Sequence, residues 1–153
     1  MADQTSRAAD WGLLFLRVGA GLMLISLHGW GKLTGAYGNL IHGQEWGFIG
    51  GVASLGFPFA TFFAVCAALS ESVGALMLAA GLYTRYAAIP IGFTMLVATY
   101  RHVTTDMRFE LAAVYLLIAV MFALVGPGRF SLDELLLNRA KVEKAEPAAS
   151  AAG

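Results

Sequence analysis

The sequence predicts an all-α integral membrane protein, a bundle of four transmembrane helices. Hydrophobic residues make up 58% of the 153 residues and charged residues only 13%, with a mean hydropathy of +0.69, which is too apolar for a soluble domain of this length. Four apolar stretches approach the roughly 17 to 25 residues that cross a hydrocarbon core. They are residues 11–30, 59–82, 87–100 with its flanks, and 111–125.

Proline and glycine mark the ends of these stretches. Pro58 fits the first turn of the second helix, and Gly81 fits its C-terminal cap. Pro90 falls near the start of the third helix, where a missing N–H group costs least, and Gly126 ends the fourth. Arg17 interrupts the apolar core that a cleavable signal peptide would need, so we expect the first helix to remain in the mature protein.

The basic residues predict that both termini are cytoplasmic. Loops on the cytoplasmic side of a membrane carry an excess of Lys and Arg, and four crossings put six basic residues on the side of the termini and three on the other. The six are Arg7, Arg85, Arg129, Arg139, Lys141 and Lys144, and the three are Lys32, Arg101 and Arg108. We therefore expect residues 1–10 to be cytoplasmic and the protein to lie in a bacterial inner membrane.

The connections predict one further membrane-associated segment and a tail. Residues 31–57 are rich in glycine and aromatics, and their apolar part, 46–55, is too short to cross, so we expect an interfacial or re-entrant segment between helices 1 and 2 that covers a site. Ser131 and Glu134 have the capping-box spacing, which predicts a short surface helix. The membrane domain then spans residues 11–137, and residues 138–153 are expected to be a disordered tail.

Three ionisable residues predict a charge pair inside the membrane. A charged side chain in a spanning helix costs about 2.5 to 3.5 kcal/mol on insertion scales, so it must be paired or functional. Glu71 lies halfway along the second helix beside small residues, and we expect Arg17 to be its partner, with Arg85 second. A pair that only fixes helix packing is about as probable as a functional one, because buried pairs often hold register without chemistry.

Polar residues near the outer ends of the helices predict a pocket. On an α-helix His28 and Lys32 share a face one turn apart, and the helix directions bring them near His102 and near Glu110 at the start of the fourth helix. Tyr115 lies one to two turns further along and either bonds into the pocket or packs. The pocket suits an anionic or quinone-like head group, with a histidine exchanging protons; the alternative is side chains that reach toward the interface.

Several classes of function are disfavoured. A net charge of zero and a sequence pI of about 6.8 do not indicate a nucleic-acid partner. The three histidines lack metal-binding spacing, so no metal site is predicted. Cys66 is the single cysteine, which excludes dithiol exchange within the chain. Because the sequence has neither a cysteine cluster nor a nucleotide-binding glycine loop, electrons would have to come from a bound small molecule or a partner chain.

Short motifs in a fixed order give the chain a family resemblance. They are LR at 16–17, HGWGKL at 28–33, ASLGFP at 53–58, E at 71, GLYTR at 81–85, ELA at 110–112 and GPGRFSLD at 126–133. From about residue 13 to residue 136, the chain resembles the DoxX family of small bacterial membrane proteins. The resemblance implies a four-helix membrane domain and an oxidoreductase component linked to quinone or thiol chemistry through partner proteins. By position, it implicates Arg17, His28, Lys32, Glu71, Arg85 and Glu110.

We therefore expect a membrane subunit or accessory protein of an oxidoreductase system, whose pocket binds a quinone or a similar small molecule. The partners would be the lipid bilayer, a membrane or soluble redox protein and, through the Gly and Ala faces, a second copy of the chain. The alternative is a non-enzymatic assembly or cargo-binding membrane protein. A small-solute transporter is less favoured, because neither paired broken helices nor an inverted repeat is evident.

Overall fold

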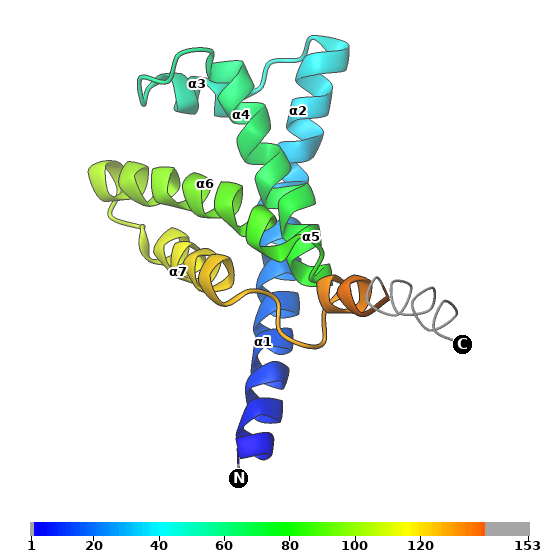
Figure 1. The fold of residues 1–153 in the computed structure, drawn as a ribbon. Coiled ribbons are helices and arrows are strands. Elements are labelled where there is room, and N and C mark those ends of the chain that lie inside the picture. Colours follow the sequence, from blue (N-terminus) through cyan, green and yellow to red (C-terminus); the bar gives the residue numbers. More distant parts are fainter. Residues whose placement is uncertain (1, 140–153) are drawn as a thin grey trace.

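The computed structural model describes residues 2–139, with side chains from Arg7 onward. All regular elements within this range are helical, as predicted, and none is a strand. Figure 1 shows a long N-terminal helix, a second helix beside the half of it that leads away from the N-terminus, and a hairpin of two helices that runs across it. The chain between the first and second helices forms a cap at one end of the molecule.

The first helix is much longer than predicted. It runs from α1 (Ala2–Leu24) through a π-helical segment, η1 (Ile25–Gly29), into α2 (Trp30–His42) and ends at Gly43, which has a positive φ of 63°. The prediction of a loop from residue 31 is therefore wrong. Glycines within α2 are contact points rather than helix ends: a Cβ at Gly35 would clash with the side chain of Trp46.

The second helix is also built from three parts. A short helix, α3 (Gly47–Ala53), precedes it, and the helix itself is α4 (Ala60–Leu69), the π-helical segment η2 (Ser70–Gly74) and α5 (Ala75–Ala80). Gly81 caps its C-terminal end with a φ of 71°, as predicted. Pro58 lies before the helix rather than in its first turn, because Phe59 takes a left-handed conformation and the helix begins one residue later.

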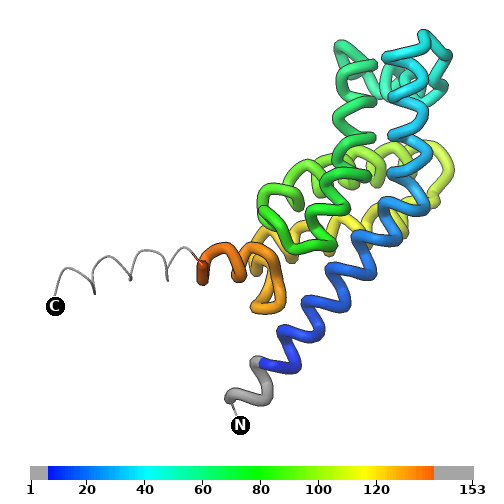
Figure 2. The backbone as a smooth tube through the Cα atoms, turned by 90° about the vertical axis from the view of Figure 1, so that its right-hand side faces the viewer, coloured from blue at the N-terminus to red at the C-terminus, as the bar shows by residue number. Residues whose placement is uncertain are grey.

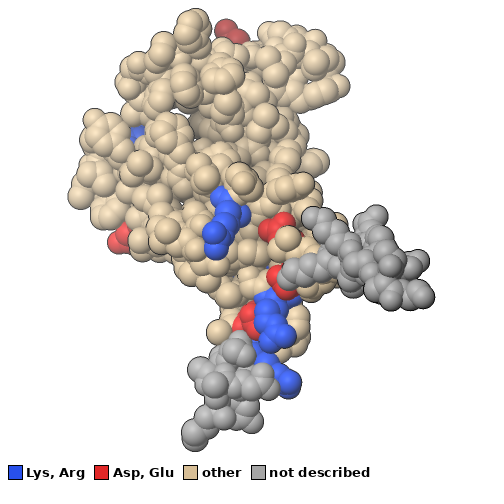
Figure 3. Space-filling model, viewed as in Figure 1, with Lys and Arg blue, Asp and Glu red and all other residues tan. Residues whose placement is uncertain are grey.

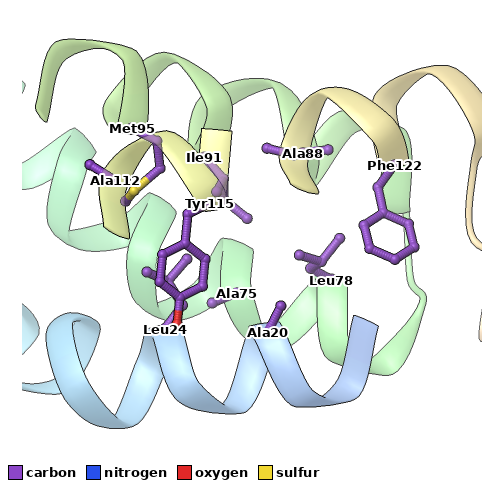
Figure 4. Close-up of a cluster of buried hydrophobic side chains, with 11 residues drawn as sticks. Ala20, Leu24, Ala75, Leu78, Ala88, Ile91, Met95, Ala112, Tyr115 and Phe122 are labelled. Carbon is purple, nitrogen blue, oxygen red and sulfur yellow. The ribbon is translucent and has the colours of Figure 1, made fainter. Parts of the chain in front are cut away.

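The last two long helices form a hairpin. These are α6 (Thr84–Thr105), which contains Pro90 at its seventh position rather than in its first turn, and α7 (Glu110–Val125). Both views show them side by side, and Figure 1 shows them crossing α1 instead of running along it. The core lies where α1, α5, α6 and α7 meet (Figure 4). Its largest members are Leu24, Leu78, Ile91, Met95, Tyr115 and Phe122.

The outer surface is largely apolar. Two helices within the described residues are long and apolar enough to cross a membrane, Arg7–His42 and Ala60–Ala80, and Glu110–Val125 is apolar but shorter. Only 28% of the apolar window of the first helix is buried, unlike the core helix of a soluble protein. Figure 3 shows charged side chains gathered toward the end where the chain begins, with a broad uncharged surface above them. Such a surface is typical of contact with lipid.

A turn and a short helix follow α7, as the capping-box spacing predicts. Residues 132–139 are helical, and the Ser131 hydroxyl accepts a hydrogen bond from the Glu134 N–H at 3.2 Å. Residues 138 and 139 therefore belong to this helix and not to a disordered tail. The rest of the predicted tail, with Lys141 and Lys144, lies outside the described residues.

Candidate functional site

The two π-helical segments face each other and carry two of the candidate site residues. His28 lies in η1 and Glu71 lies in η2. The helices meet here backbone to backbone, because a Cβ at Gly29 would clash with the carbonyl oxygen of Glu71 and lie 3.0 Å from the Cα of Ser72. Single π turns within α-helices are rare and recur at functional sites. The contact between these two segments therefore makes this level of the helices a candidate site.

Glu71 forms its ion pair with Lys32. Lys32 Nζ donates to Glu71 Oε1 at 2.5 Å, and the side chains are 24% and 1% exposed respectively. The ammonium also lies 4.8 Å from the centre of the Phe48 ring, within range of a cation–π interaction. The buried carboxylate therefore has a cationic partner, but the partner is not the residue that we predicted.

Arg17 is buried elsewhere and is held by carbonyl groups. It is only 2% exposed, and its guanidinium donates to the carbonyl oxygens of Ala79 at 3.2 Å, Pro127 at 2.8 Å and Phe130 at 2.8 Å. The predicted Arg17–Glu71 pair is not formed. The pair is absent because the two residues lie at different levels. Arg17 lies level with Ala79, which is eight residues and about 12 Å along the second helix from Glu71.

The same end of the molecule is tied together by Asp133. Its carboxylate accepts hydrogen bonds from the backbone N–H groups of Tyr83 at 2.6 Å and Thr84 at 2.9 Å, which caps the start of α6. The Asp133 N–H in turn donates to the Gly81 carbonyl at 2.9 Å. Arg85 is exposed and lies beside Gly126, so it is not the second partner of Glu71. Hydrogen bonds therefore hold the segments 81–85 and 126–133 together, which is a structural role.

A cavity of about 410 Å³ lies beside the Lys32–Glu71 pair. Its walls come from η1 and α2, α3, α4 and η2, and α6, and they are mostly apolar, with phenylalanines 48, 57, 63 and 93. Its volume falls within the usual range for small-molecule sites. Two buried polar atoms of its lining residues, His28 Nδ1 and Glu71 Oε2, have no hydrogen-bond partner within the described residues. Such atoms are costly unless another group satisfies them.

The short helix α3 forms one wall of this cavity and is fastened to α6. Arg101 donates from Nη1 to the Gly51 carbonyl at 2.9 Å and to the Ser54 hydroxyl at 3.2 Å. The segment predicted to cover a site thus lines the cavity. His102 also lines the cavity, and its Nδ1 lies 2.9 Å from Asp106 Oδ1. This hydrogen bond lowers the pKa of Asp106, which is in the loop after α6.

The structure brings together three of the five residues that we predicted for the pocket. His28, Lys32 and His102 line the cavity, whereas Glu110 and Tyr115 do not. Figure 1 shows the reason: α7 packs on the side of α6 away from α3. Glu110 is exposed, and Tyr115 is buried in the core, where it points toward Leu24 of α1 (Figure 4). The centre of the Tyr115 ring lies 6.4 Å from the centre of the His28 ring, so the two rings pack edge to face.

Sequence reasoning missed the aromatic walls and the π segments. The phenylalanines of residues 46–57 were a usable signal, because an aromatic, glycine-rich segment too short to cross must pack on something. Nothing in the local sequence marks a π turn. Within the described residues, no group of three or more His, Cys, Asp or Glu side chains is placed to hold a metal ion.

Comparison with known proteins agrees with the motifs. The model of the DoxX family matches residues 12–105, more than half of the chain, and this range includes α3, α4, α5 and α6 with every cavity residue. No curated protein and no solved structure matches the chain. The family match confirms the resemblance, and with the apolar, outward-facing helices it makes the chain a membrane protein. The chain belongs to the DoxX family.

Proposed function

We propose that this chain is a membrane subunit or accessory protein of an oxidoreductase system, and that its cavity binds a quinone or a similar small molecule. One observation carries the proposal: Glu71 Oε2 is buried with no hydrogen-bond partner among the described residues, next to Lys32 Nζ, in a mostly apolar cavity of about 410 Å³. A cavity with apolar walls and a few convergent polar groups is the usual form of a small-molecule site.

The polar groups suit a quinone ring. A quinone carbonyl accepts hydrogen bonds, which Lys32 or a protonated His28 nitrogen can donate, and a quinol hydroxyl donates one, which Glu71 Oε2 can accept. Because Glu71 already neutralises Lys32, an anionic head group gains less here than it would beside an unpaired lysine. Reduction of a quinone consumes two electrons and two protons. In this proposal a redox partner protein supplies the electrons, and the His28 imidazole passes protons to the ring oxygens.

The test is ligand binding by the purified chain. A decyl-substituted benzoquinone should raise the unfolding temperature of the wild type in detergent, and this shift should be lost in Lys32→Met and reduced in His28→Ala. Glu110→Gln is the matched control, because Glu110 is an exposed residue outside the cavity and its variant should keep the full shift. Equal shifts in all four proteins would place the quinone elsewhere and overturn the proposal.

We also propose four membrane crossings, with both termini on the cytoplasmic side of a bacterial inner membrane. The apolar composition of α7 and its pairing with α6 in a hairpin support this. A Cys66→Ser background allows single cysteines to be placed on each side of α7, at Met107 and at Leu137. In intact spheroplasts, an impermeant maleimide should label Met107→Cys, and Leu137→Cys only after lysis. Labelling of both from outside would exclude the crossing of α7.

A non-enzymatic assembly role is the second candidate, and the packing role of Arg17 and Asp133 favours it. These residues belong to the family motifs yet hold helices together. This candidate predicts that Lys32→Met and His28→Ala leave a co-purifying partner and the cellular function intact. Loss of function with the partner still bound would count against it.

A further inference from the structure

The cavity reaches the outer surface of the molecule between α4 and α6. Cys66 of α4 and Phe93 of α6 both line it, and both are exposed on the outside, Phe93 by 52%. A residue that is a cavity wall and also part of the outer surface lies at the rim of an opening. Figure 1 shows α4 and α6 diverging from each other toward α3, and Figure 3 shows the surface hollowed between α3 and α6.

The surface around this opening is apolar. About one helical turn from Cys66 or Phe93 lie Phe62 of α4 and Ile89 and Leu96 of α6, which are large apolar residues 53% to 63% exposed. A group of large apolar side chains on the flank of a membrane helix is solvated by lipid tails at little cost, and by water only at a large one. The opening is therefore of the kind that admits molecules from the bilayer.

The opposite end of the cavity is closed and polar. Glu71 is 1% exposed, and the backbone contact between Gly29 and Glu71 shuts the cavity behind it. A hydrogen bond of 2.8 Å between the hydroxyls of Ser70 and Thr94 joins η2 to α6 at its edge. Lys32 supplies hydrogen-bond donors there, and Glu71 Oε2 is an acceptor without a partner within the described residues.

We propose that the occupant is an amphiphile that enters from the lipid between α4 and α6. Its neutral head group, with a hydroxyl or carbonyl oxygen, binds at Lys32, Glu71 and His28, and its apolar chain leaves the cavity past Cys66 and Phe93 into the bilayer. The inference rests on the proposed function and narrows its ligand class to tailed, uncharged molecules. A carboxylate head is excluded from this class, because it would meet the Glu71 carboxylate at close range.

The rate of alkylation of Cys66 tests whether the apolar chain of a ligand passes through the opening between α4 and α6. In nanodiscs of one fixed lipid composition, we would follow alkylation of Cys66 by a membrane-permeant maleimide, with unfolding temperature as the independent measure of binding. The probes are a decyl benzoquinol, a tetramethyl benzoquinol without a tail, and decanoate. The matched control is Cys66→Ser with Leu69→Cys, which moves the thiol to an exposed site on α4 outside the cavity lining.

The tailed quinol should slow alkylation of Cys66 at least threefold and leave that of Leu69→Cys unchanged. The tailless quinol should raise the unfolding temperature without protecting Cys66, and decanoate should do neither. If the tailed quinol binds by thermal shift but Cys66 reacts at its free rate, or if the tailless quinol protects Cys66 equally, the lateral route is wrong and the quinone site stands. If neither quinol shifts the unfolding temperature, the proposed function falls together with this inference.

Discussion

Replacement of Lys32 by methionine should destabilise the protein by about 3 kcal/mol. The substitution keeps a long apolar stem but leaves the carboxylate of Glu71, 1% exposed, without its cation. Breaking a buried ion pair by removing one partner costs about 3 to 5 kcal/mol. We take the lower end, because the Lys32 side chain is 24% exposed and solvent screens part of the interaction. For a chain of this length, that loss lowers the unfolding temperature by roughly 6 to 12 °C.

A double-mutant cycle isolates the pair from the rest of the site. Glu71→Gln removes the charge and keeps the shape, and we expect it to cost about 1 to 2 kcal/mol, since Lys32 can turn toward solvent. With both substitutions no buried charge remains, so the double variant should be more stable than Lys32→Met alone. The coupling free energy should be about 2 kcal/mol, measured by reversible unfolding in mixed micelles with tryptophan fluorescence as the signal.

Two results would refute this reasoning. If Lys32→Met unfolds within about 0.5 kcal/mol of the wild type, the range of an ordinary surface substitution, the pair does not stabilise the fold. If the double variant is no more stable than Lys32→Met, the loss comes from the contact of Lys32 with the Phe48 ring or from packing, and not from an unpaired Glu71.

Three further substitutions test the packing that builds the site. Gly29→Ala should cost at least about 2 kcal/mol and remove quinone binding, because its Cβ clashes with the Glu71 carbonyl, whereas Gly31→Ala meets nothing within 4 Å and should be neutral in the same unfolding assay. Arg17→Met should cost about 3 kcal/mol or more, because three carbonyl groups lose their donors, with the exposed Arg85→Met as a near-neutral control. Asp133→Ala should cost about 0.5 to 2 kcal/mol and increase amide hydrogen exchange in the first turn of α6.

The helices could be predicted from the sequence, but not all of the residues at which they end. Gly81 and Gly126 stop helices where the chain needs a positive φ, and such positions can be read from residue type. Gly35 and Gly38 carry the same residue type but lie within α2, where the side chains of Trp46 and Gln44 occupy the space that a Cβ would fill. A glycine that ends a helix and one that receives a neighbour look identical in sequence.

The partner of Glu71 depended on register, which composition does not encode. On a straight α-helix, a count of 100° per residue predicts which residues of the first helix share a face. The structure interrupts that count with the five residues of η1, whose wider turns carry more residues per turn, so the azimuth of everything after them shifts. The axial match is equally hidden: Ala79 lies level with Arg17 and Ala75 with Gly21, which leaves Glu71 nearer the level of Lys32.

The family motifs therefore divide into two groups with different physical tasks. Arg17 binds three carbonyl groups of an irregular turn and a helix end, and backbone groups such as these need a donor in any folded copy of the chain, whatever the cavity holds. Lys32 lies about 22 Å further along the first helix. It pairs with Glu71 of η2 and leaves one oxygen of that carboxylate without a hydrogen-bond partner among the described residues. A purely structural pair could be replaced by apolar residues with little loss of stability. Packing alone gives no reason for the unpaired oxygen, and our proposal of ligand binding rests on it.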